Sequence, residues 1–76
     1  MDVLDTVAVT DYFNMLERMM RTNTHRSHPD KVRQTIASLS QYESKMDQTD
    51  LTFLNICRHY HDEQLEWKND IYRLTR

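Results

Sequence analysis

The chain has no glycine among its 76 residues, and this absence constrains its fold more than any other feature of the sequence. Glycine supplies the positive φ angles that type I′ and II′ hairpin turns require. It also lets phosphate-binding loops of the GxGxxG or GxxxxGK type approach their ligand closely. Helices, by contrast, are favoured by a glycine-free sequence. We therefore predict an all-α fold and exclude the glycine-dependent nucleotide-binding loops.

Length and composition predict one small domain. Seventy-six residues suggest a single all-helical domain over 1–76, and a chain of this size buries only about 60% of the surface it exposes when unfolded. No apolar run approaches the roughly 18 residues of a membrane span. The acidic start, Met1-Asp2-Val3-Leu4-Asp5, differs from an export signal. The lone Cys57 cannot form an intramolecular disulfide. We expect a cytoplasmic protein with no membrane partner.

A first helix is predicted over residues 10–20, with Thr10 as its N-cap. Apolar side chains recur there every three or four positions, a spacing typical of one helical face. They are Val9, Tyr12, Phe13, Leu16, Met19 and Met20. Residues 2–9 fit either a longer helix or a short extended arm.

A second helix is predicted over residues 28–46, after a polar loop at 22–27. Ser27 stands at the expected N-cap, and Pro29 lies in the first turn, where its missing amide hydrogen costs nothing. One face carries a narrow apolar stripe, which indicates a one-sided amphipathic helix. The stripe consists of Val32, Ile36, Leu39, Tyr42 and Met46.

A third helix is predicted over residues 50–73, after the polar break at 47–50. Apolar residues recur along it at seven-residue steps, which keep a seam facing a partner helix. These residues are Phe53, Tyr60, Trp67 and Leu74. At about 1.5 Å per residue this helix outruns the first two, so we expect its C-terminal part to project. The predicted architecture is a three-helix bundle, or a helical hairpin with an added N-terminal helix, and we expect it to be oligomeric.

The function that this pattern favours is a non-enzymatic protein-binding module acting through helix–helix contacts, such as a regulator, adaptor, inhibitor or co-chaperone. Methionine suits adaptable binding surfaces, and large aromatic side chains are common in interface hot spots. The predicted contact residues are Met15, Met20, Tyr60, Trp67, Ile71 and Leu74. The expected partner is another protein or a second copy of the chain, and we expect no cofactor.

The charge distribution supports an alternative function, a nucleic-acid-associated transcriptional modulator. Residues 18–33 hold five cations and one acid, a net charge of 5 − 1 = +4, whereas residues 43–70 hold three cations and seven acids, 3 − 7 = −4. The five cations, which could contact phosphates, are Arg18, Arg21, Arg26, Lys31 and Arg33. The overall charge of −2 differs from the strongly basic footprint usual for nucleic-acid-binding domains.

A second alternative is a small metal-binding domain. Cys57 and His61 are four residues apart on one helical face, a spacing that suits zinc ligands, and His25 or His28 could complete the site. The paired CxxC and HxxxH signatures of strong sites are absent. We predict no catalytic residue, because the apolar neighbours of Cys57 indicate burial and no carboxylate pair lies in apolar surroundings.

The Thr10-Asp11-Tyr12 tripeptide and the order of the predicted helices resemble the Hha/YmoA group of small bacterial gene-regulation modulators. The similarity covers these three residues and the helix layout; the remainder of the first helix and the surroundings of His59 and His61 differ from that group. The resemblance implies a compact all-helical protein that acts by binding a DNA-organising protein. It implies no role for any single residue.

Overall fold

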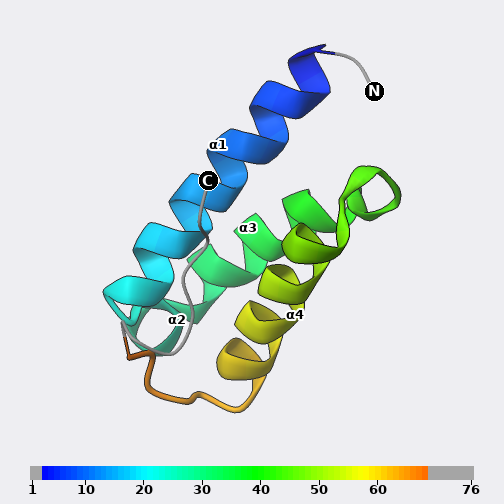
Figure 1. Cartoon of the computed structure of the whole chain (residues 1–76). Helices are drawn as coiled ribbons and strands as arrows, with labels where there is room; N and C mark the ends of the chain where they lie inside the picture. Colours follow the sequence, from blue (N-terminus) through cyan, green and yellow to red (C-terminus); the bar gives the residue numbers. More distant parts are fainter. Residues whose placement is uncertain (1–2, 69–76) are drawn as a thin grey trace.

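A computed structural model describes residues 3–68, and its described elements are all helical (Figure 1). They are α1 (Val3–Arg21), α2 (Thr24–Ser27), α3 (Pro29–Ser40), the 3₁₀ helix η1 (Glu43–Lys45) and α4 (Gln48–Asp62). The predicted all-α class is confirmed. The three predicted helices are all present, but their bounds differ from the prediction, and α2 is an additional turn of helix.

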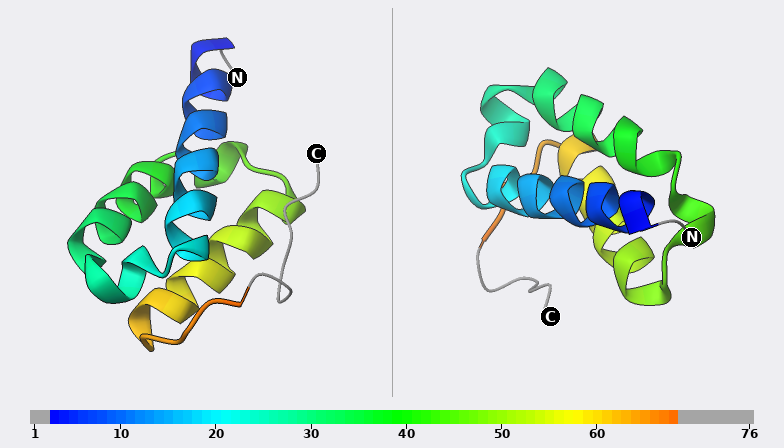
Figure 2. Two further views of the ribbon diagram at one scale, coloured as in Figure 1. Left: turned by 90° about the vertical axis from the view of Figure 1, so that its left-hand side faces the viewer. Right: turned by 90° about the horizontal axis from the view of Figure 1, so that it is seen from above.

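Helix α1 begins at Val3 rather than at residue 10, so the predicted N-cap at Thr10 lies inside the helix and the extended arm is wrong. Residues 3–9 contain neither glycine nor proline, and Val9 continues the apolar spacing of the helix. One face is buried, through Val9, Phe13, Leu16 and Met20. The first turns of α1 extend past the ends of α3 and α4 (Figures 1 and 2).

The segment predicted as a loop at 22–27 contains α2, a single turn that leads directly into α3. The N-cap of α3 is His28 and not Ser27, which is the last residue of α2. Pro29 occupies the first position of α3, as predicted, and Asp30 follows it in the first turn. A carboxylate there interacts favourably with the positive end of the helix dipole.

Helix α3 ends at Ser40, so the prediction that it reaches residue 46 is wrong. The Ser40 hydroxyl donates to the Ile36 carbonyl over 2.9 Å, a bond that competes with regular helix geometry. The Arg58 guanidinium of α4 donates to Ser40 Oγ over 2.6 Å and forms an ion pair with Glu43 at 2.5 Å. These contacts tie the turn after α3 to α4. Tyr42 beyond the turn still packs against the core.

Helix α4 begins at Gln48 because Asp47 caps it. The Asp47 carboxylate accepts a hydrogen bond from the Asp50 amide over 2.9 Å, which satisfies one of the unpaired amides of the first turn. The predicted start at residue 50 is two residues too late, although it lies close to the polar residue that supplies the cap.

Replacing Asp47 with alanine is expected to lower the free energy of unfolding by about 1 kcal/mol, because the Asp50 amide loses its partner. Urea denaturation followed by circular dichroism measures this loss. Thr49→Ala is the matched control, since this exposed side chain lies in the same turn and forms no cap. Equal losses in the two variants would contradict a capping role for Asp47.

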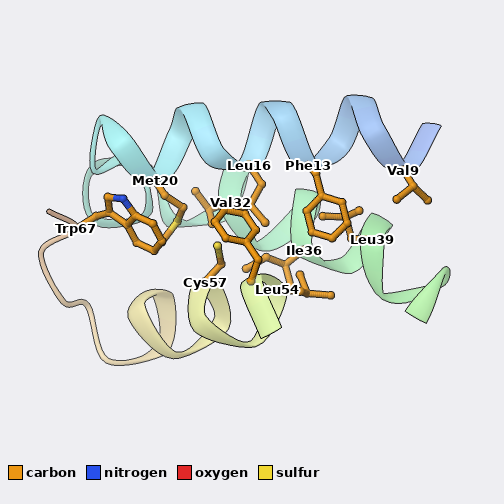
Figure 3. Close-up of a cluster of buried hydrophobic side chains, with 11 residues drawn as sticks. Val9, Phe13, Leu16, Met20, Val32, Ile36, Leu39, Leu54, Cys57 and Trp67 are labelled. Atoms are coloured by element: carbon orange, nitrogen blue, oxygen red, sulfur yellow. The ribbon is translucent and has the colours of Figure 1, made fainter. Parts of the chain in front are cut away.

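The core lies where α1 packs across α3 and α4, and the segment after α4 closes one end of it (Figure 3). An aromatic cluster runs through this core. The ring centroids of Phe13 and Phe53 are 6.0 Å apart, those of Phe53 and Trp67 are 6.1 Å apart, and those of Tyr60 and Trp67 are 5.1 Å apart. The cluster therefore links α1, α4 and the chain beyond α4.

The predicted continuation of the third helix to residue 73 is wrong for residues 63–68, because α4 ends at Asp62. The Leu65 amide donates to the Tyr60 carbonyl over 3.0 Å, and the Gln64 amide donates to the His61 carbonyl over 3.3 Å. These two bonds form a Schellman motif, in which the residue after the C-cap adopts a left-handed conformation. Gln64 has that conformation, with φ 54°. Residues 69–73 lie outside the described part.

Candidate functional site

Trp67, predicted to project on a long helix, is instead a core residue with 4% of its surface exposed. It lies at the same end of the core as Met20, between α1 and α4 (Figure 3). Its ring packs edge-on against Phe53 and Tyr60. The seven-residue spacing places Trp67 on one stripe with Phe53 and Tyr60, and the three rings do pack together. The predicted projection of Trp67 toward a partner is wrong, because the backbone folds back and buries the ring.

We call residues 64–68 the strap, because they run from the end of α4 back across the start of α2. The side chain of Asn23 holds the strap through two hydrogen bonds. Its Oδ1 accepts from the Trp67 backbone amide over 2.7 Å, and its Nδ2 donates to the Trp67 carbonyl over 3.4 Å. His25 Nε2 donates to the Leu65 carbonyl over 2.6 Å, and Gln64 Nε2 donates to the His25 carbonyl over 2.8 Å. The spacing of apolar residues in the sequence gives no indication of these hydrogen bonds.

The other predicted contact residues are divided between core and surface. Met20 is fully buried, and Tyr60 is half-buried against the core. Met15 is 47% exposed. Ile71 and Leu74 lie outside the residues that the structure describes. Met15 is therefore the predicted contact residue that the structure places in the open.

We define the α1 flank as Ala8, Tyr12, Met15 and Met19, which are half-buried or exposed along one side of α1. At about 100° per residue, their spacing of four, three and four keeps them within roughly 60° of the helix circumference. The flank borders α3, because the Thr35 hydroxyl oxygen lies 3.8 Å from Met15 Sδ. Tyr12 and Met19, which were predicted to belong to the apolar stripe, are partly buried and pack against the core at the edge of the flank. The spacing through Ala8 is the signal that separates the flank from the fully buried face.

The five basic residues of the alternative prediction are all exposed around α2, the end of α1 and the start of α3. Arg21 forms an ion pair with Glu17 at 3.8 Å, and Arg33 forms one with Asp30 at 2.5 Å. Within residues 6–68, no ion pair involves the remaining three. They are Arg18, Arg26 and Lys31.

The two residues of the metal alternative lie in different environments. Cys57 is buried in the core, and His61 donates from Nε2 to the Pro29 carbonyl over 3.2 Å. Among the described residues, no group of three or more His, Cys, Asp or Glu side chains is placed to hold a metal ion. Burial, together with the nearby Glu17 carboxylate, raises the pKa of the Cys57 thiol.

Cys57 is expected to react with iodoacetamide at least about 100-fold more slowly in the folded chain than in urea, because the reactive thiolate is suppressed and labelling requires local opening. Mass spectrometry of timed aliquots measures the difference. Labelling at equal rates in the two conditions would show that the thiol is accessible in the folded state.

A shallow hollow of about 250 Å³ lies on α1 and is lined by Asn14, Glu17, Arg18 and Arg21. Its lining residues come from one helix and offer amide, carboxylate and guanidinium groups. The prediction that the chain is not an enzyme stays a prediction.

Comparisons with known protein families, with curated proteins and with solved structures found no match for the chain. None of the described helices combines the length and the apolar character that crossing a membrane requires.

Proposed function

We propose that the chain is a non-enzymatic protein-binding module whose contact surface is the α1 flank. The observation that carries this proposal is the exposure of Met15, 47%, on a flank that also carries two half-buried apolar side chains, Tyr12 and Met19. In a chain with so few core residues, an apolar side chain left outside the core forgoes the burial that stabilises the fold.

The chemistry of the flank suits a helical partner. Spacing of three and four residues along α1 matches the way in which an amphipathic helix presents anchors to a neighbour. Methionine side chains adapt to differently shaped surfaces, and tyrosine contributes a ring and a hydroxyl group. The first turns of α1 extend past the other helices and lengthen the surface that a helical partner could contact (Figure 2).

The proposal is tested with two variants that introduce the same charge on neighbouring positions. Met15→Glu places a carboxylate on the α1 flank, whereas Asn14→Glu places one on a different, exposed side of the same helix. Tagged wild-type chain is used to capture proteins from the cell in which it is made, and light scattering measures its self-association. We expect the wild-type chain to bind a stoichiometric partner or to form a dimer. Met15→Glu should lower the affinity of that complex at least about tenfold, whereas Asn14→Glu should leave it unchanged.

Two results would contradict the proposal. A wild-type chain that is strictly monomeric and captures no stoichiometric protein would not be a binding module of this kind. Equal weakening by the two variants would show that the α1 flank is not the surface involved. Thermal unfolding of each variant separates these results from a loss of folding.

A nucleic-acid-associated function remains the second candidate, supported by Arg18, Arg26 and Lys31, whose exposed charges have no acidic partner among the described side chains. Contacts to phosphates release counterions, so binding to duplex DNA should weaken steeply as salt increases. Fluorescence anisotropy with a labelled duplex tests this, with Arg26→Glu as the variant expected to reduce affinity. Absence of binding at low salt would exclude this candidate.

A further inference from the structure

Gln64, at the junction between α4 and the strap, adopts a backbone conformation that favours glycine. Its φ of 54° lies in the left-handed region, where a side chain with a β-carbon is disfavoured. Glycine usually occupies this position of a Schellman motif. Asn23, the other described residue with positive φ, belongs to a residue type that tolerates this region better than glutamine does.

The sequence around this junction has a helical preference that the structure does not use. Residues 63–68 are Glu-Gln-Leu-Glu-Trp-Lys, without glycine, proline or a β-branched residue. Glutamate, glutamine, leucine and lysine are among the better helix formers. Trp67 also continues the seven-residue spacing of Phe53 and Tyr60. The local sequence thus favours continuing α4 where the backbone turns away.

Contacts with distant parts of the chain oppose this preference. Asn23 and His25 provide the hydrogen bonds that hold the strap, and the core buries Trp67. One of these contacts is incomplete: His25 is fully buried, its Nε2 donates to Leu65, and its Nδ1 has no hydrogen-bond partner. An unpaired buried nitrogen disfavours the clasped arrangement.

We propose that the segment after α4 is a two-state switch: the strap is clasped against Asn23 and His25 in one state, and in the other it is released and extends α4 through residue 68. In the released state Gln64 has an ordinary helical conformation. Trp67 then lies about 10 Å along the helix axis from Tyr60, past the present end of α4. The switch exchanges a buried tryptophan for an exposed one, and it is independent of the α1 flank.

A matched pair of variants at Gln64 tests the switch, with the single tryptophan of the chain as the probe. Gln64→Gly and Gln64→Ala both remove the side-chain hydrogen bonds to the His25 and His61 carbonyls. They differ in backbone preference, because glycine accommodates a positive φ and alanine favours helix. We expect the alanine variant to shift the equilibrium toward the released state by roughly 30-fold relative to the glycine variant.

Two signals measured together identify extension. Release of Trp67 moves its fluorescence emission to longer wavelength. Extension adds six helical residues to α-helices of 19, 4, 12 and 15 residues, so the circular dichroism signal of helix should rise by about a tenth at full conversion. The expected result for Gln64→Ala against Gln64→Gly is a longer-wavelength emission together with a higher helix signal.

Asn23→Gly provides an independent test with the wild-type sequence at the junction. Glycine keeps the positive φ of Asn23 but removes both hydrogen bonds to the Trp67 backbone. The same pair of signals is expected to change in the same direction. Identical spectra for the two Gln64 variants would overturn the switch. So would exposure of Trp67 with a constant or falling helix signal in Gln64→Ala and Asn23→Gly, because the strap would then detach without extending α4.

Discussion

Replacing Trp67 with alanine is expected to lower the free energy of unfolding by about 3 kcal/mol or more, as large-to-small changes of buried aromatic residues do. The side chain is 4% exposed and its ring contacts both Phe53 and Tyr60. Domains of this size have little more stability than that in total, so much of the variant should be unfolded at room temperature.

Leu65→Ala is the matched control for Trp67→Ala. Leu65 belongs to the same strap, but its side chain is exposed, and the contact that holds it uses its backbone carbonyl, which alanine retains. Urea denaturation followed by circular dichroism measures both variants without relying on tryptophan fluorescence. A loss below about 1 kcal/mol for Trp67→Ala, or equal losses for the two variants, would show that Trp67 does not close the core.

The position of Trp67 shows what the sequence could predict and where local patterns failed. Its seven-residue spacing from Phe53 and Tyr60 placed the three residues on one apolar stripe, from which we predicted a seam that faces a partner. A seven-residue step does not distinguish a continuing helix from a segment that folds back onto the same cluster. The decision depends on Asn23 and His25, more than 35 residues earlier in the chain, and no local propensity describes those bonds.

The bounds of the other helices also divide into those set by nearby residues and those set by contacts with distant parts of the chain. Pro29 and the apolar stripe of α3 were predictable because they depend on residues close in sequence. The end of α3 at Ser40 was not, because Arg58 of another helix holds that turn. For the candidate site, Met15 was predictable from the methionine cluster. The packing of α1 against the other helices determines that Met15 is exposed and Met20 is buried, and the sequence alone does not show this difference.

Phe53→Ala is expected to be at least as destabilising as Trp67→Ala, by about 3–5 kcal/mol, since Phe53 is fully buried between Phe13 of α1 and Trp67 of the strap. Its removal takes away the ring contacts with both neighbours. Urea denaturation followed by circular dichroism should therefore find little folded protein for Phe53→Ala.

Milder substitutions make the link between Phe53 and Trp67 quantitative. Phe53→Leu, Trp67→Leu and the double variant form a double-mutant cycle, and an edge-on aromatic pair should give a coupling of about 0.5–1.5 kcal/mol. Phe53→Leu combined with Val7→Ala is the control, because the exposed Val7 lies outside the core cluster and the two losses should add. A coupling near zero for the first pair would mean that Trp67 does not pack on Phe53 in solution, and the strap would then not close this core.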